Sequence, residues 1–449
     1  MMRSLYSGVS GLKVHQTKMD VIGNNIANVN TVGFKSQRVS FNELFYQTTQ
    51  SASGPNAETS TGGQNAKQIG LGASVGQISI NISQEGGSQS TGNAFDLKIN
   101  GSSFFVVNSG GADYYTKAGN FTTDGFGNLV TGSGAYVMGY AAERDATTGD
   151  FVLLTDELRP ISLYSDEYMY TAPAQTMNAT MTGNINSEDA DFTTTGIGYK
   201  APDLYVYDSL GNKYGVQMKI EQVEGSTTEY VMTPLKIFKG TEEIEDMSAI
   251  FVGDGVTTDA DGNTAISLTF DGTTGLITTT PAELTINILD ADGDKADAFQ
   301  QDIVMDFSTL TCYGSEYSVT AEKDPLGGGK AVGNMISLGI QTDGKIIASY
   351  DNGDTACIGQ IATATFANPA GLEKAGDNMY SSTMNSGDAT TGDITSFGET
   401  MSSGVVEMSN VDLAAEFTDM IVTQRGFQAN SRVITTSDTM IEELINLKR

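Results

Sequence analysis

The chain is poor in several residue types on which particular functions depend. Its 449 residues include no tryptophan, eight prolines, two cysteines and one histidine. Cys312 and Cys357 are too few for a disulfide framework; we expect buried free thiols, with a disulfide or a cross-link as the open alternative. His15 is the only histidine, so Ser–His or Cys–His nucleophilic sites lack their usual base. No catalytic residues are therefore expected.

Basic side chains are scarce as well. The chain has 24 Lys and Arg against 55 Asp and Glu, a formal net charge of −31. The first 45 residues carry +3 and residues 401–449 carry −3, so the segment between them holds the whole excess of acid. Such a body repels phosphates and anionic lipid headgroups. Neither nucleic acid nor a membrane is expected as a partner.

Long hydrophobic runs are missing too. No run of 18 apolar residues is present, which argues against a transmembrane helix. Near the N-terminus Ser7, Gly8, Ser10 and Lys13 interrupt the apolar core that a cleaved signal peptide would need. The 39% of apolar residues nevertheless suffices for folded cores, in two to four domains.

Both ends of the chain show heptad repeats of apolar residues. A helix with so narrow a stripe gains about 1.5–3 kcal/mol per buried side chain, against a cost of about 1–2 kcal/mol per ordered residue. We therefore expect the two ends to pack against each other and against further copies of the chain, as in an assembly protein. The predicted polymerisation seam comprises Leu5, Leu12, Met19, Ile22, Ile26, Val29, Leu413, Phe417, Met420, Phe427, Ile434, Ile441 and Leu444.

Between the ends, period-two alternation and 52 glycines indicate many short strands. The predicted fold is mixed and mainly β, with α-helical N- and C-terminal segments that pair as a coiled coil, followed by two mostly antiparallel β domains, the second inserted in the first. The predicted segments are an N-terminal helix (1–45), an extended arm or linker (46–68), the first β domain (69–145 and 311–377), an inserted outer β domain (146–310), a linker (378–404) and a C-terminal helix (405–449).

Several local patterns imitate ligand sites without meeting their requirements. Residues 327–330 resemble a phosphate-binding loop but lack its Ser or Thr and its first glycine, so a turn is expected. Residues 290–301 and 259–263 have calcium-loop spacing without the required glycine. Hairpin turns are preferred there, with weak cation binding left open. No cofactor and no metal site is predicted.

Two function classes compete with an assembly role on these patterns alone. One is a monomeric, β-rich adhesin that an intramolecular coiled coil closes. The other is a polysaccharide hydrolase with paired carboxylates, although no pair stands out among the many acids.

Both ends of the chain contain distinctive local motifs. Their residues are Asn24, Asn25, Asn28, Asn30, Gly33, Phe34, Lys35, Arg425, Gly426, Gln428 and Asn430. With these motifs the chain resembles the rod, hook and hook-associated axial proteins of bacterial flagella. The likeness covers about residues 1–140 and 310–449, and residues 96–107, 115–121 and 366–374 resemble the first β domain of that family.

The resemblance implies a structural subunit that polymerises helically into a hollow, flexible tube, a universal joint that couples rod to filament and transmits torque. The outer insertion favours a hook member over a shorter rod member, and a hook-associated junction protein is the close alternative. Implied partners are copies of the chain itself, the hook cap, the distal rod, the hook–filament junction proteins and the flagellar export apparatus. The implied location is the extracellular hook and basal body, after export without a cleaved signal peptide.

Overall fold

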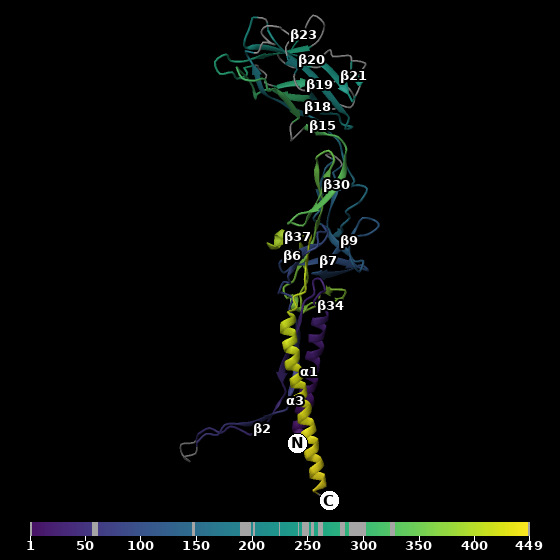
Figure 1. Cartoon of the computed structure of the whole chain (residues 1–449), viewed down its shortest axis with the longest axis vertical. Helices are drawn as coiled ribbons and strands as arrows, with labels where there is room; N and C mark the ends of the chain where they lie inside the picture. The colour runs from purple at the N-terminus through teal and green to yellow at the C-terminus, as the bar shows by residue number, and fades with distance from the viewer. Residues whose placement is uncertain are drawn as a thin grey trace.

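The computed structural model shows an elongated molecule with a helical stem at one end and a β domain at the other (Figure 1). Both chain termini lie at the free end of the stem. The structure describes residues 2–55, 62–145, 149–188, 199–200, 203–223, 225–240, 242–244, 251–252, 256–258, 264–278, 283–286, 302–323 and 328–447. Within that part of the chain, no helix is both long and apolar enough to cross a membrane.

The stem consists of two antiparallel helices, α1 (Met2–Ala27) and α3 (Leu413–Asn446), which pack along most of their length. Both ends of the chain therefore form helices that pair, as predicted. α1 is shorter than the predicted segment 1–45, because the asparagine-rich residues after Ala27 form turns and the chain then turns into strand β1.

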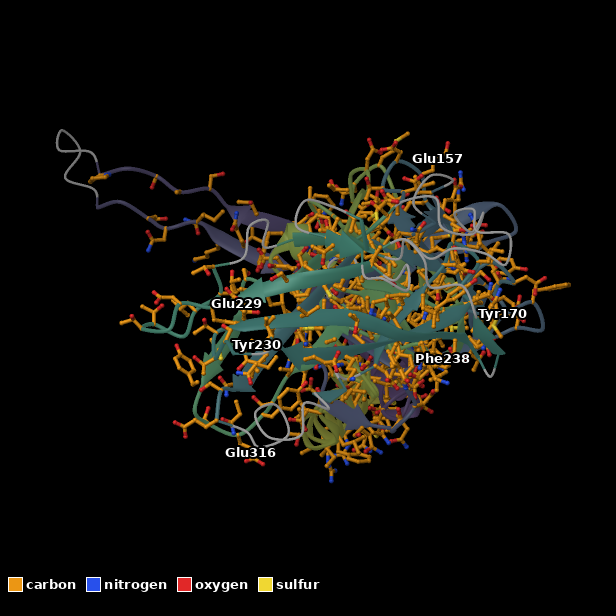
Figure 2. The ribbon with its side chains drawn as sticks, turned by 90° about the horizontal axis from the view of Figure 1, so that it is seen from above. Glu157, Tyr170, Glu229, Tyr230, Phe238 and Glu316 are labelled. Atoms are coloured by element: carbon orange, nitrogen blue, oxygen red, sulfur yellow. The ribbon has the colours of Figure 1, made fainter. Side chains whose placement is uncertain are left out.

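A two-stranded ribbon packs beside the stem and continues into an arm. β1 (Gln37–Glu43) pairs with β4 (Ala73–Ile80) and contacts α1. Beyond them β2 (Tyr46–Gln50) pairs with β3 (Lys67–Gly70) and projects to one side of the body (Figures 1 and 2). The segment predicted as an extended arm thus contains a β-ribbon.

The inner β domain is built from two stretches of chain that meet in one large, mainly antiparallel sheet. Its central order is β14-β30-β31-β32-β11-β7-β8-β35-β34. The first stretch contains β5 (Ser88–Ser90), β6 (Leu97–Asn100), β7 (Phe104–Ser109), β8 (Ala112–Thr116), β9 (Phe121–Thr123), β10 (Leu129–Thr131), β11 (Tyr136–Arg144), β12 (Phe151–Leu153), β13 (Arg159–Pro160) and β14 (Tyr170–Thr171). The second contains β30 (Gly333–Ile340), β31 (Lys345–Tyr350), β32 (Thr355–Ile361), β33 (Thr363–Thr365), η1 (Pro369–Gly371), β34 (Glu373–Gly376), β35 (Met379–Ser381), β36 (Thr390–Gly392), η2 (Ile394–Phe397), β37 (Thr400–Ser403) and β38 (Val405–Glu407).

The outer β domain has two sheets around its own core, in which Met218, Tyr230, Met305 and Phe307 are fully buried. Figure 2 views this domain from above, with Tyr230 and Phe238 on its strands. Its strands are β15 (Ala174–Thr176), β16 (Asn178–Asn186), β17 (Tyr199–Lys200), β18 (Leu204–Tyr207), β19 (Lys213–Gln222), β20 (Glu229–Lys239), β21 (Glu242–Ile244), β22 (Phe251–Val252), β23 (Val256–Thr258), β24 (Thr264–Thr269), β25 (Glu283–Ile286), β26 (Ile303–Asp306), β27 (Leu310–Tyr313), β28 (Thr320–Lys323) and β29 (Gly328–Lys330).

The boundaries of the insertion differ from the predicted 146–310. Strands β12 and β13 pair with β11, and β14 pairs with β30, so residues 151–171 still belong to the inner sheet. The insertion starts after β14 and ends near β29. The predicted linker 378–404 likewise holds strands, because β37 pairs with β6. Strand pairing between distant segments decides these boundaries. The change of composition along the chain does not reveal that pairing.

Candidate functional site

The two stem helices are held in one register by small residues that receive larger ones. When a residue of α1 faces a residue of α3, the two residue numbers add up to 441 or 442. At one end of the stem, the hydroxyl groups of Ser4 and Ser437 are in contact. At the other end, Asn25 Nδ2 donates a hydrogen bond to Glu416 Oε1 (2.9 Å). Between them Gly8 faces Ile434, Gly11 faces Asn430 and Gly426 faces His15.

Two of these glycines leave no room for a larger residue. A Cβ on Gly11 would stand 2.6 Å from the Asn430 side chain, and one on Gly426 would stand 2.7 Å from the His15 ring. The ring also makes an edge contact with Phe41 of β1, with centroids 6.0 Å apart. His15 therefore packs between the stem and the ribbon.

The stem contact includes polar residues that an apolar heptad search overlooks. Thr423 and Ser437 are the buried residues of α3, and Asn430 lies between them against Gly11. Their spacing of seven is itself visible in the sequence. On α1, Val14 and Val21 are buried although neither belongs to the predicted seam.

The predicted seam residues divide between two environments. Ile22 is buried; Leu5, Leu12, Met19, Ile26, Val29, Met420, Ile434 and Ile441 are half-buried. Leu413, Phe417, Phe427 and Leu444 are exposed, Phe417 and Leu444 by half of their surface. α3 thus presents one face to α1 and keeps further apolar side chains on its outer surface.

The turn after α1 is shaped by asparagine and glycine. Asn28 Nδ2 donates to the carbonyl and side-chain oxygens of Asn24 (2.9 and 3.0 Å). Asn25 is buried and exchanges hydrogen bonds with the Gln37 backbone. Gly33 has a φ of 69° and lies so close to Ala118 that a Cβ would stand 2.6 Å from its nitrogen, so only glycine suits this position.

Four other residues of the family motif lie outside these contacts, and three of them are at the surface. Asn30, Arg425 and Gln428 are exposed, and Arg425 donates to Gln428 Oε1 at 3.4 Å. Phe34 is buried beneath the ammonium of Lys374, which lies 4.4 Å from its ring centroid. Among them, only Phe34 has a packing role that the structure explains.

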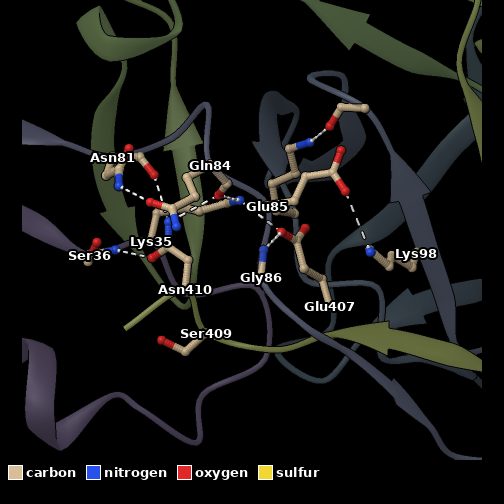
Figure 3. Close-up of polar contacts among 12 residues, drawn as sticks. Lys35, Ser36, Asn81, Gln84, Glu85, Gly86, Lys98, Glu407, Ser409 and Asn410 are labelled. Atoms are coloured by element: carbon tan, nitrogen blue, oxygen red, sulfur yellow. Dashed lines mark hydrogen bonds and ion pairs between the residues drawn. The ribbon is translucent and has the colours of Figure 1, made fainter. Parts of the chain in front are cut away.

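A buried ion pair joins the two ends of the chain where the stem meets the inner β domain (Figure 3). Lys35 Nζ lies 2.8 Å from Glu407 Oε1, and both side chains are only 1% exposed. Lys35 also donates to the Gln84 carbonyl at 2.7 Å, and the Gly86 N–H donates to the same Glu407 oxygen at 2.8 Å. We call these four residues the clasp. The two charges of the clasp lie 372 positions apart along the chain. The clasp therefore joins the segment that follows α1 to the segment that precedes α3.

Asn410 extends the clasp toward α3. Its Oδ1 accepts a hydrogen bond from the Ser36 N–H at 2.8 Å, and its Nδ2 donates to the carbonyls of Asn81 and Gln84 (Figure 3). Asp412 then caps α3, accepting from the N–H groups of Ala414 and Ala415. The segment that leads into α3 is therefore hydrogen-bonded to the Gln84 carbonyl of the clasp and to its neighbours Ser36 and Asn81.

A second buried cation stands near the clasp. Burial lowers the pKa of Lys117 to about 8, although the charge of Glu407 opposes that shift. Its ammonium donates to the Gly101 carbonyl at 2.6 Å and lies 5.1 Å from the Phe104 ring centroid. The carboxylate of Glu407 thus serves an electrostatic role for two lysines.

Among the remaining candidates of the sequence, the structure describes part of the glycine-rich segment and the two cysteines. Gly328–Lys330 is strand β29 and pairs with β15, where a turn was predicted. The acidic segments 259–263 and 290–301 lie outside the described residues. Cys312 and Cys357 are free and half-buried. Among the residues that the structure describes, no three His, Cys, Asp or Glu side chains are grouped to hold a metal ion.

These features define an elongated structural subunit whose two chain ends form one clasped stem beneath two β domains, the architecture expected of an axial component of the flagellum. Four family models match in chain order: the flagella basal body rod protein (5–35), the flagellar hook protein FlgE/F/G D1 domain (98–186), the flagellar basal body protein FlaE D2 domain (172–324) and the flagellar basal body rod FlgEFG protein C-terminal (402–447). The chain belongs to this family of flagellar hook and basal-body rod proteins.

Curated relatives match from end to end. Flagellar hook proteins FlgE of Treponema pallidum and Borreliella burgdorferi are each 36% identical, with 100% of both chains covered. The flagellar basal-body rod protein FlgG of Bacillus subtilis is 32% identical, again with 100% of both chains covered. Because a relative with a rod-protein name aligns over the whole chain, the outer insertion does not by itself separate hook from rod, contrary to the expectation from length.

Proposed function

We propose that this chain is the structural subunit of the flagellar hook and polymerises helically through its stem. The observation that carries the proposal is the full-length similarity to two hook proteins, together with a stem built from both chain ends. The family is one of structural proteins, and the polymer belongs to the axial part of the flagellum.

The stem supplies surfaces for contacts between copies. Phe417 and Ile421 lie on the outer surface of the upper half of α3, and Leu444 lies near its end, all at least half exposed. Apolar side chains in a row on a helix gain free energy when a neighbouring helix covers them. The residues of the predicted seam therefore have two roles. Those that face α1 stabilise the stem, and the exposed ones contact other copies of the chain.

The β domains would form the outer part of a hollow tube that bends while it turns. Their acidic surfaces favour shallow, hydrated contacts that can slide, in contrast to the apolar contacts of the stem. Such a tube would serve as the universal joint between rod and filament and would transmit torque.

The resemblance to axial flagellar proteins also supports specific partners and a route. The chain would pass through the flagellar export apparatus without a cleaved signal peptide, fold beneath the hook cap, and join the distal rod at one end of the hook and the junction proteins at the other. No enzymatic activity is proposed.

A distal rod subunit is the second candidate, favoured by the full-length match to the Bacillus subtilis rod protein. The two functions differ in the length of the polymer and its position. Immunogold labelling of isolated flagella would place the chain along the curved hook under the first proposal and at the cell-proximal rod under the second.

Electron microscopy of the concentrated full chain tests polymerisation. Tubes are expected from the natural chain, and Phe417→Glu or Ile421→Glu should prevent them without unfolding the stem, because these side chains face away from α1. Thr418→Glu, an exposed position on the same turn, is the matched control and should leave tubes intact. Tubes from the Phe417→Glu and Ile421→Glu chains would contradict a polymer built on this surface.

A further inference from the structure

Two segments of the chain, residues 170–176 and 328–334, connect the β domains, and we call them the neck (Figure 1). On the inner side β14 pairs with β30, and on the outer side β15 pairs with β29. Both pairings keep one register, because facing residue numbers add up to 504 in each. Residues 172–173 and 331–332 lie between the two pairings and belong to neither. The neck is therefore one antiparallel ribbon with an unpaired step in its middle.

The unpaired step is the place where the neck bends most readily. Pro173 has no N–H group, so it cannot donate a hydrogen bond across the ribbon. A two-stranded ribbon is only marginally stable without further packing, and the core of the outer domain shares no residue with the inner cores. Contacts around the step therefore have a large effect on the angle between the two domains.

A hairpin turn of the inner domain holds the step. The turn comprises residues 351–354, between β31 and β32, and we call it the latch. Asn352 Nδ2 donates to the Ala331 carbonyl at 2.9 Å and to Thr171 Oγ1 at 3.1 Å. A Cβ on Gly333 would stand 2.6 Å from the Asn352 side chain, so the amide lies close against the ribbon. One side chain of the latch thus holds both segments of the neck.

An ion pair of the latch crosses the step. Lys330 is the last residue of β29 on the outer side, and its Nζ lies 2.7 Å from Asp354 Oδ2 and 3.4 Å from Asp150 Oδ1. The side chains of Lys330 and Asp354 are 28% and 27% exposed, so dissolved salt reaches the pair and screens it. The latch therefore ties the outer side of the step to the inner domain by charge as well as by hydrogen bonds.

A turn of the outer domain packs against the same step. A Cβ on Gly211 would stand 2.9 Å from the Pro173 side chain and 3.2 Å from the Val332 nitrogen. The turn is held in shape by Asp208, which is fully buried and accepts a hydrogen bond from the Asn212 N–H at 2.7 Å. This contact gives the outer domain a firm support on which it can pivot.

We propose that the step is a hinge and that the latch sets the angle at which the outer β domain stands on the inner one. Asn352 and Asp354 are positioning residues in this device, because they hold the neck without belonging to any of the cores. With the latch closed the two domains keep one angle, and with the latch open the outer domain swings about the step. The hinge is a property of the single chain. Only its consequence for a tube, an adjustable angle of the outer domains as the tube bends, rests on the proposed function.

The distance between the two domains in the monomer tests the latch. The full chain carries Ser109→Cys on the inner domain and Glu229→Cys on the outer domain, both exposed positions, in a background with Cys312→Ser and Cys357→Ser. Nitroxide labels on the two new cysteines report the distribution of distances by pulsed electron paramagnetic resonance. One narrow distribution is expected from dilute chains with an intact latch, and a broad one would overturn the proposal.

Asn352→Ala combined with Asp354→Ala opens the latch and should replace the narrow distribution by a broad one. Asp343→Ala is the matched control, since Asp343 pairs with Lys345 at 3.1 Å in the turn at the opposite end of β31, and it should leave the distribution narrow. None of the substituted residues belongs to a core, so circular dichroism should show folded domains in every variant. A narrow distribution without the latch contacts, or equal broadening by the control, would overturn the proposal.

Salt separates the two kinds of contact in the latch. In the Asn352→Ala chain the ion pair remains, so about 1 M NaCl, at which the screening length is about 3 Å, should broaden the distribution. In the Asp354→Ala chain the hydrogen bonds of Asn352 remain, and the same salt should broaden the distribution less. Equal responses of the two chains would overturn the role of the Lys330–Asp354 pair.

The outcomes separate this inference from the proposed function, because the monomer is measured. A neck that behaves alike with and without its latch would leave the hook function standing. A chain that forms no tubes would leave the latch standing.

Discussion

At the scale of single residues, the clasp holds two opposite charges in a buried site. Lys35 and Glu407 are buried in contact, so removing one charge leaves the other without its partner in a low-dielectric site. We expect Glu407→Gln to lower the free energy of unfolding by about 3–5 kcal/mol, measured by urea titration with circular dichroism. Lys35→Met combined with Glu407→Leu should recover most of that loss. Glu143→Gln, which breaks the exposed pair with Arg159, should cost about 0–1 kcal/mol; an equal loss for both single variants would refute the role of burial.

His15 makes the stem sensitive to acid. Burial, and secondarily the charge of Lys18, lower its pKa below 6.5 in the folded chain, and its ring faces uncharged Gly426 on α3 and Phe41 on β1. The unfolded chain then binds the proton more readily, so His15 contributes its full share of stability above pH 6.5 and loses it as the pH falls toward the folded pKa. Because it is the only histidine, its NMR titration is unambiguous. His15→Phe should remove this part of the pH dependence; a folded pKa at or above 6.5 would contradict the expectation.

At the scale of elements, the register of the stem depends on glycines, not on apolar side chains alone. Gly426→Ala would press a methyl group against the His15 ring, and overpacking of this kind costs about 1–3 kcal/mol. Gly23→Ala, on the open side of α1 with no atom within 4 Å of the new Cβ, should instead stabilise the helix by about 0.5–1 kcal/mol. Opposite shifts in the thermal midpoint, recorded by circular dichroism at 222 nm, are expected. Equal shifts of the thermal midpoint would mean that the close contact between Gly426 and His15 does not fix the register of the two helices.

At the scale of the whole molecule, the two β domains have separate cores, and we expect them to behave as independent units. The outer core contains only residues 179–319, whereas the inner cores draw on both flanking stretches. Thr171 and Gly333 face each other across the neck, so residues 172–332 form a segment that can be excised. As a separate fragment it should unfold cooperatively, with the midpoint that the outer domain shows in the full chain. The full chain should correspondingly show more than one calorimetric transition, and a fragment that fails to fold would contradict this independence.

Local patterns were sufficient for the stem and for the general order of the domains. Leu12, Met19 and Ile26 repeat every seven residues and indicated a helix, and the period-two alternation between the chain ends indicated strands, because these periodicities follow from backbone geometry alone. They did not show where each element ends. The insertion was placed at 146–310 because composition changes there, while strands β12 to β14 still hydrogen-bond to the inner sheet.

The sequence by itself determined that both chain ends are helical, that the body is β and acidic, and that a family resemblance spans both ends. Only the tertiary structure decided which side chains of α3 face α1 and which remain exposed, since a heptad repeat states that apolar residues share a stripe and not what covers it. Thr423 and Ser437 are buried because they meet α1 at the contact face. Lys35 and Glu407 form the ion pair of the clasp because packing brings together residues 372 positions apart, and such a pair depends on the geometry of the elements between them.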